Sequence, residues 1–199
     1  MTLRLLARQT LIALALLGAT ASPAISAEKA HQEEAIHDLD RAFLNRAAEV
    51  HLYEQAASKL AAKSADRPDL KQYAKKTLAD NETTGKNLKA IAEKRKVALP
   101  TTPNAQQRQN LEKLSSLQGE AFDKAFLTVG AEYQFENVER YKRTAERSLD
   151  TAVKGYARRA LPDLERHRAM FNTIAQAVVP EAFRPTGGTA PTNRMSDQK

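Results

Sequence analysis

The chain has 199 residues, no cysteine, a formal net charge of +7 and a mean hydropathy of −0.56. This length allows one domain with a sizeable core, and the lack of cysteine excludes disulfide bonds, thiolate chemistry and a lipid-anchored N-terminal cysteine. The net positive charge favours attraction to acidic envelope components. Because the 24 acidic residues are interspersed with the 31 basic ones, the sequence predicts no continuous basic surface for nucleic acid.

The N-terminus has the pattern of an export signal. Arg4 and Arg8 supply a positive start, residues 11–19 form an apolar run, and Ile25-Ser-Ala27 offers a cleavage site of small residues. The apolar run is shorter than the roughly 20 residues that a membrane-spanning helix needs. We therefore expect residues 1–27 to be a cleaved signal peptide, and the mature protein to reach the periplasm or outer envelope.

Four long helical patterns follow, and together they predict an all-α fold. We expect residues 28–183 to form one helical domain and the Pro-, Gly- and Thr-rich residues 184–199 to be a disordered tail. The first helix is predicted from about Glu33 to Ser64, and its inner stripe contains Ile36, Phe43, Ala47, Val50, Ala57 and Ala61.

The second and third helices are delimited by prolines. Asp66 is expected to cap the second helix with Pro68 in its first turn, and this helix should end before the loop Leu99-Pro-Thr-Thr-Pro103. Its inner stripe is predicted to contain Leu70, Ala74, Thr77, Leu88 and Ile91. Thr102 is expected to cap the third helix, which should run to about Ser148 with a break near Gly119.

The third and fourth helices complete the pattern. The third has an inner stripe of Leu117, Ala121, Leu127, Ala131, Val138, Tyr141 and Ala145, and Gly130 within it predicts a close helix contact or a bend. The fourth begins at Asp150, contains Pro162, and has an inner stripe of Val153, Ala157, Ala160, Leu164, Phe171, Ile174 and Val178. Four such helices predict an antiparallel four-helix bundle.

Each inner stripe contains one polar residue: Glu54, Asn81, Gln134 or His167. Since they occupy mid-helix positions, we expect them to meet in a polar layer through the core. A buried polar group without a partner destabilises the fold by about 1 to 3 kcal/mol, so the four side chains should satisfy one another.

The alternative to a structural layer is a metal site, because ferritin-like bundles bind iron or manganese through inward carboxylates and histidines. Glu54 and His167 are then the metal ligands, with Asp80 or Glu136 recruited nearby, and iron, manganese or zinc is the cofactor. Asn and Gln are poor ligands, so two good ligands remain where three or more are normal. The structural reading, with no cofactor, is therefore preferred.

Four segments resemble the domain of unknown function 4142 family in order and spacing. They are Phe43-Leu-Asn-Arg-Ala-Ala48 with Glu54, Ala79-Asp-Asn81, Gly119-Glu-Ala-Phe-Asp123, and Leu161-Pro-Asp-Leu-Glu-Arg-His167. The resemblance covers about residues 38–177. It implies an exported, ferritin-like helical bundle of the kind often labelled an outer-membrane protein, in a family with no assigned activity.

The same resemblance implies a metal-binding set in other family members, where histidine usually stands at the positions of Asn81 and Gln134. This sequence keeps Glu54 and His167 of that set. Since no phosphate loop, no Gly-x-Ser-x-Gly elbow and no aromatic–basic interleaving accompanies it, we expect no catalysis and no nucleic-acid binding.

The sequence thus predicts a non-enzymatic envelope protein with a structural, interaction or stress-related role. Its expected partners are acidic envelope components or another envelope protein, with peripheral membrane contact, and the patterns favour no particular oligomeric state.

Overall fold

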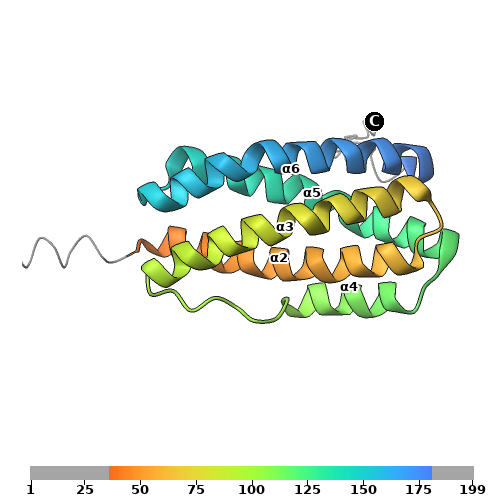
Figure 1. The fold of residues 1–199 in the computed structure, drawn as a ribbon, viewed down its shortest axis with the longest axis horizontal. Coiled ribbons are helices and arrows are strands. Elements are labelled where there is room, and N and C mark those ends of the chain that lie inside the picture. The colour runs from red at the N-terminus through yellow and green to blue at the C-terminus, as the bar shows by residue number, and fades with distance from the viewer. Residues whose placement is uncertain (1–35, 181–199) are drawn as a thin grey trace, which may run out of the picture. The chain divides into compact units, whose positions relative to one another are not determined.

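The computed structural model describes residues 36–180, which are all-α: they form five helices and no strand. The expected signal peptide, the residues preceding Ile36 and the tail at 184–199 lie outside the described residues. Figure 1 shows the helices, which are α2 (Asp38–Ser64), α3 (Pro68–Lys94), α4 (Ala105–Ser115), α5 (Gly119–Arg147) and α6 (Thr151–Val178).

Each of the four long helices packs against two others. Helix α2 contacts α3 and α5, and α6 also contacts α3 and α5. Figure 1 shows that neighbouring long helices run in opposite directions, because residues 95–118 return along the length of the domain between α3 and α5. Helix α4 lies within this return segment and packs on α2 and α5.

The predicted third helix is two helices. Helix α4 ends at Ser115, and α5 begins at Gly119, whose φ of +60° suits a residue without a side chain. The expected break near Gly119 is therefore confirmed. The break also resets the phase of the inner stripe, so Ala121 is exposed, contrary to the prediction, and Phe122 and Phe126 are buried in its place.

Two predicted helix caps are wrong. Asn104, rather than Thr102, is the N-cap of α4, because its side chain and that of the buried Gln107 form a reciprocal capping box that satisfies two amide groups. Asp66 does not cap α3, whose N-cap is Arg67. The helix begins instead with Pro68 in its first turn, as expected.

The predicted stripes of α2 and α3 are buried, and they contribute to two apolar clusters. One cluster includes Phe43, Leu44 and Tyr156, and the other includes Leu70, Phe122 and Phe171. Gly130 makes the expected close contact, since an added Cβ would lie 2.5 Å from the Phe171 ring. Polar residues occupy the helix positions between the two clusters.

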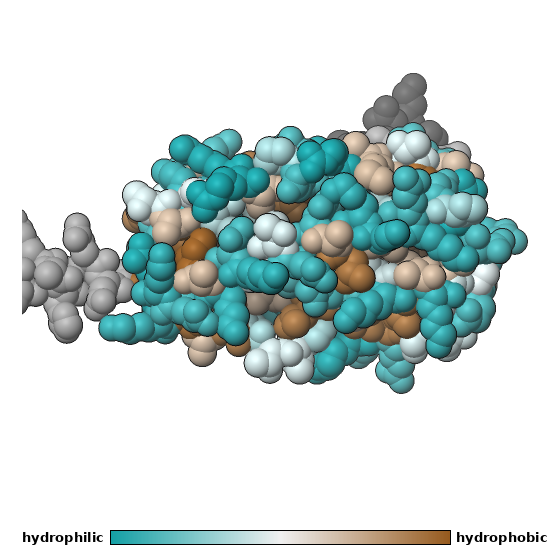
Figure 2. Space-filling model, in the orientation of Figure 1, coloured by the Kyte–Doolittle hydropathy of each residue, from teal (hydrophilic) through white to brown (hydrophobic). Residues whose placement is uncertain are grey.

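The face of the protein drawn in Figure 2 is mainly hydrophilic. Figure 2 shows polar side chains over most of the visible face, with apolar ones in small separate patches. Among residues 36–180, no helix is long and apolar enough to span a bilayer.

Candidate functional site

A polar cavity of about 20 Å³ lies between α2, α3, α5 and α6. Glu54 of α2, Asp80 and Asn81 of α3, and His167 of α6 line it, with Tyr141 of α5 at its wall. Glu54, Asn81 and His167 stand where the inner stripe passes the middle of the helix, so helical periodicity turns these side chains inward. Asp80, in contrast, lies beside the stripe and is partly exposed. The volume is enough for about one water molecule.

Of the four polar residues expected to satisfy one another, Glu54 and Asn81 are hydrogen-bonded directly. The Asn81 amide donates to Glu54 Oε2 at 3.2 Å, and Asn81 is buried while Glu54 is partly buried. Burial raises the pKa of Glu54 to about 7, although the bond from Asn81 lowers it in part. Glu54 therefore changes charge close to neutral pH.

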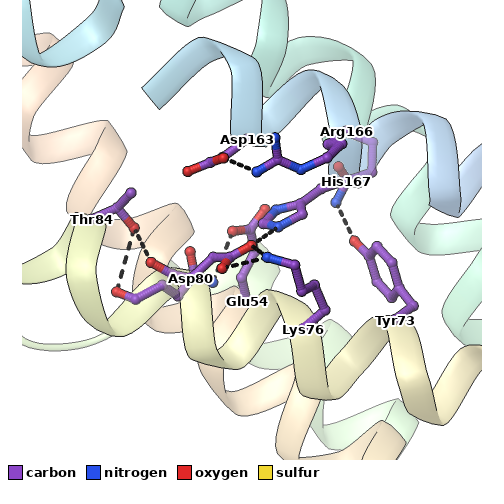
Figure 3. A network of polar contacts seen from close by, with 10 residues as sticks. Glu54, Tyr73, Lys76, Asp80, Thr84, Asp163, Arg166 and His167 are labelled. Atoms are coloured by element: carbon purple, nitrogen blue, oxygen red, sulfur yellow. Dashed lines mark hydrogen bonds and ion pairs between the residues drawn. The ribbon is translucent and has the colours of Figure 1, made fainter. Parts of the chain in front are cut away.

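His167 pairs with Asp80 instead of Glu54. His167 Nε2 lies 2.8 Å from Asp80 Oδ2, and the Lys76 ammonium donates to Asp80 Oδ1 at 2.7 Å (Figure 3). Burial raises the pKa of Asp80, but the hydrogen bonds from Lys76 and His167 outweigh it and hold that pKa below its ordinary value. Asp80 is thus a carboxylate shared between a histidine of the core and a lysine at the surface.

Gln134 is buried but bonds outside the cavity. Its amide donates to the Tyr73 hydroxyl at 2.9 Å, and the Tyr73 ring makes an edge contact with His167 at 6.4 Å between centroids. Glu54 and Gln134 both line a second small cavity on the other side of Glu54. The structure therefore brings Glu54 and Asn81 into direct contact, whereas His167 and Gln134 bond to Asp80 and Tyr73 and not, as predicted, to other members of the layer.

All five tyrosines of the chain line these cavities or adjoin them, and of the five only Tyr141 was predicted from the sequence to face inward. Tyr141 and Tyr156 share a hydrogen bond of 3.1 Å between their hydroxyls, and Tyr53 stacks on Tyr133 at 4.8 Å between centroids. Burial, together with the nearby Glu54 carboxylate, raises the pKa of Tyr156 to about 12. Their spacing within the inner stripes is the signal that could have found them.

His51 forms one wall of the polar cavity and also lines a surface groove between α2 and α3. Its ring lies over Gly85, where an added Cβ would come within 2.2 Å of His51 Nε2. Burial lowers the pKa of His51, and Gln55 is its hydrogen-bond partner at 3.1 Å. Gly85 is therefore needed for the close approach of α3 to this histidine.

The donor set does not fit a metal ion as it is arranged. Within residues 36–180, no group of three or more His, Asp and Glu side chains is placed to hold one. The Glu54 carboxyl group already accepts a hydrogen bond from Asn81, and the Asp80 carboxylate accepts one from Lys76. Glu136, the other recruit considered from the sequence, is exposed and lies 3.7 Å from Arg140, away from the cavity.

The fold and this cavity define a class: an all-α protein whose core holds separate hydrogen-bonded pairs of polar side chains. A family model described as Domain of unknown function (DUF4142) matches residues 25–174. The chain belongs to this family, as its sequence motifs indicated. Neither the curated proteins nor the solved structures gave a match.

Proposed function

We propose that this protein is an exported, ferritin-like four-helix bundle of the cell envelope that has a structural, interaction or stress-related role and no catalytic activity. The observation that carries the proposal is the pairing inside the core. Glu54 accepts from Asn81, His167 pairs with Asp80, and Gln134 donates to Tyr73. Groups that satisfy one another in this way stabilise a unique packing and leave few free ligands for chemistry.

The helix arrangement supports the ferritin-like part of the proposal. Bundles of that kind have antiparallel neighbours and one long crossover connection. Here the crossover is residues 95–118, and α4 gives it a helical segment that packs on α2 and α5 (Figure 1).

The export and envelope parts of the proposal are supported by the sequence. Arg4, Arg8, the apolar run at 11–19 and Ile25-Ser-Ala27 together form the signal pattern, which predicts a mature chain beginning near Glu28. Fractionation of a bacterium expressing the full chain tests this directly. We expect the processed protein in the periplasmic or envelope fraction, and unprocessed protein in the cytoplasm would overturn this part.

Metal content tests the functional part. After gentle purification, we expect iron, manganese and zinc below stoichiometric amounts, and no change in melting temperature when each metal is added. The matched variants are Glu54→Gln, in the core, and Glu82→Gln, at an exposed position of α3. One metal ion per chain that is lost in Glu54→Gln and kept in Glu82→Gln would replace the proposal with a metalloprotein.

A further inference from the structure

We propose that the groove between the start of α2 and the end of α5 docks on an anionic phospholipid membrane. The groove has a volume of about 710 Å³ and is separate from the polar cavity. The inference goes beyond the proposed function, which names no ligand or surface for the protein. It also gives the expected membrane contact a specific location on the fold.

The groove is the continuation of the channel that α4 occupies. Helix α4 begins beside α2, where the Asn104 amide donates to Glu49 at 3.3 Å, and it contacts α5 through Asn110 and Tyr133 at 3.4 Å. Past Glu49, toward the start of α2, the described chain places no further helix on the channel. Within residues 36–180, helix α4 thus covers the part of the α2–α5 channel beyond Glu49, toward the end of α2, and no helix covers the part beside the start of α2.

Positive charge lines the groove on both helices. Arg46 lies on α2, while Arg140, Arg143 and Arg147 recur on one face of α5. Arg46 has an ion pair with Glu49 at 3.0 Å, but no hydrogen bond or ion pair within residues 36–180 engages the side chain of Arg143 or Arg147. Guanidinium groups bind phosphate oxygens in a planar, two-pronged geometry, so this pair is suited to phosphodiester head groups.

The arginines of the groove also repel one another. Burial and repulsion by Arg46 and Arg143 lower the pKa of Arg140, with partial compensation by Glu136. Among the described residues, Asp40 is the single carboxylate that lines the groove, and it accepts a hydrogen bond from the backbone N–H of Asp150 at 3.2 Å. An anion that enters the groove therefore meets an excess of positive charge.

Two leucines at the open end distinguish a membrane from a soluble polyanion. Leu39 is 75 % exposed and Leu149 is 77 % exposed, and both line the groove. The Asp40–Asp150 hydrogen bond connects the backbone segments that carry them, which places both leucines at one end of the helices. Leucines next to arginines can enter the acyl layer while the guanidinium groups contact phosphates.

Vesicle sedimentation tests the proposal. The protein is purified from the cells that express the full chain and is used as it is found there. We expect it to bind phosphatidylglycerol vesicles but not phosphatidylcholine vesicles, and binding should weaken as salt is added. Replacing both exposed arginines in Arg143→Glu/Arg147→Glu should weaken binding by about tenfold or more. The control Lys71→Glu/Lys75→Glu makes the same change in net charge at exposed positions of α3 outside the groove, and should change binding less than about twofold.

A second variant pair tests the apolar contribution. Leu39→Ser/Leu149→Ser should weaken vesicle binding by about fivefold or more without changing the melting temperature, since both side chains are exposed. Three results would overturn the proposal: no binding to anionic vesicles, equal losses in the arginine and lysine variants, or binding that is insensitive to the leucines. The last would show that charge alone attracts the protein to the vesicle surface and that the leucines do not enter the acyl layer.

This experiment and the fractionation can fail separately. If the protein is exported but does not sediment with vesicles, only the membrane-binding proposal is contradicted. If it binds vesicles but is retained in the cytoplasm, only the proposed localisation in the cell envelope is contradicted.

Discussion

Glu54 has the most perturbed carboxyl group of the core, and its titration has a defined effect on stability. Its pKa rises from 4.5 to about 7 on folding because burial disfavours the charged form. The folded protein holds this proton more tightly than the unfolded chain does. The contribution of this proton to the free energy of unfolding is therefore complete below about pH 4.5, and it is lost as the pH rises through about 7. The loss is no more than about 3 kcal/mol.

We predict that Glu54→Gln removes this pH dependence. Relative to the wild type, the variant should be similarly stable at low pH and should become more stable by about 1 to 3 kcal/mol above pH 7. Urea unfolding across this pH range measures the difference. The comparison cancels the opposite titration of His51, whose lowered pKa adds stability as the pH rises. Parallel curves for the two proteins would show that Glu54 keeps an ordinary pKa.

His167 is buried, with 3 % of its surface exposed, so its volume and its hydrogen bond can be separated. We predict that His167→Leu is more stable than His167→Ala by about 1 to 3 kcal/mol, because leucine fills the site and alanine leaves a cavity. Both variants lose the bond to Asp80, which keeps Lys76 as a partner. Thermal unfolding measures the difference, and equal melting temperatures would contradict the burial of this side chain.

At the scale of helices, Asp123 of α5 holds the turn between α2 and α3. The side chain is 1 % exposed and accepts backbone N–H bonds from Asp66 at 3.1 Å and from Arg67 at 3.0 Å. It thus supplies from a distant helix the cap that Asp66 was expected to provide. The family motif Phe122-Asp123 therefore has a structural explanation: the phenylalanine enters the core and the aspartate ties two helices to a third.

We predict that Asp123→Ala lowers the free energy of unfolding by about 2 to 4 kcal/mol, because it removes charge-assisted bonds to two backbone amides. Asp123→Asn should have a smaller effect, since one amide oxygen can still accept. Urea unfolding measures both. Glu82→Ala, at an exposed position of α3, is the control and should change stability by less than about 0.5 kcal/mol. A loss in Asp123→Ala no larger than in this control would exclude the capping role.

At the scale of the whole molecule, the core consists of two apolar clusters with a polar layer between them. This arrangement favours one register of the helices, since a shift along the axis would bury Glu54 or His167 against apolar side chains. The same layer limits stability, because an apolar core of the same volume avoids the desolvation of polar groups.

We therefore predict that Glu54→Met/Asn81→Val keeps the stability unchanged or raises it by about 1 to 4 kcal/mol at neutral pH. Both partners of the 3.2 Å hydrogen bond are removed together, so neither is left unsatisfied. Denaturant unfolding gives the free energy, and vesicle sedimentation should remain unaffected, since the groove is elsewhere. A loss of several kcal/mol would show that the polar pair contributes net stability.

The sequence by itself determined the helical class and most inward-facing positions, because a period of 3.6 residues is a local property. It placed Asn81, Gln134 and His167 in the interior, where the structure finds them, and it located the break near Gly119. It also identified the family through short motifs with fixed spacing.

Only the tertiary structure decided which polar groups meet. Asp80 was considered from the sequence as a recruit for a metal, and the structure makes it the partner of His167. Gln134 bonds to Tyr73, and the cap of the α2–α3 turn comes from Asp123, 57 residues away from Asp66. Periodicity fixes the face of a helix but not its rotation or height against its neighbours. Those depend on how large side chains and glycines pack across helices, as His51 does on Gly85 and Phe171 on Gly130.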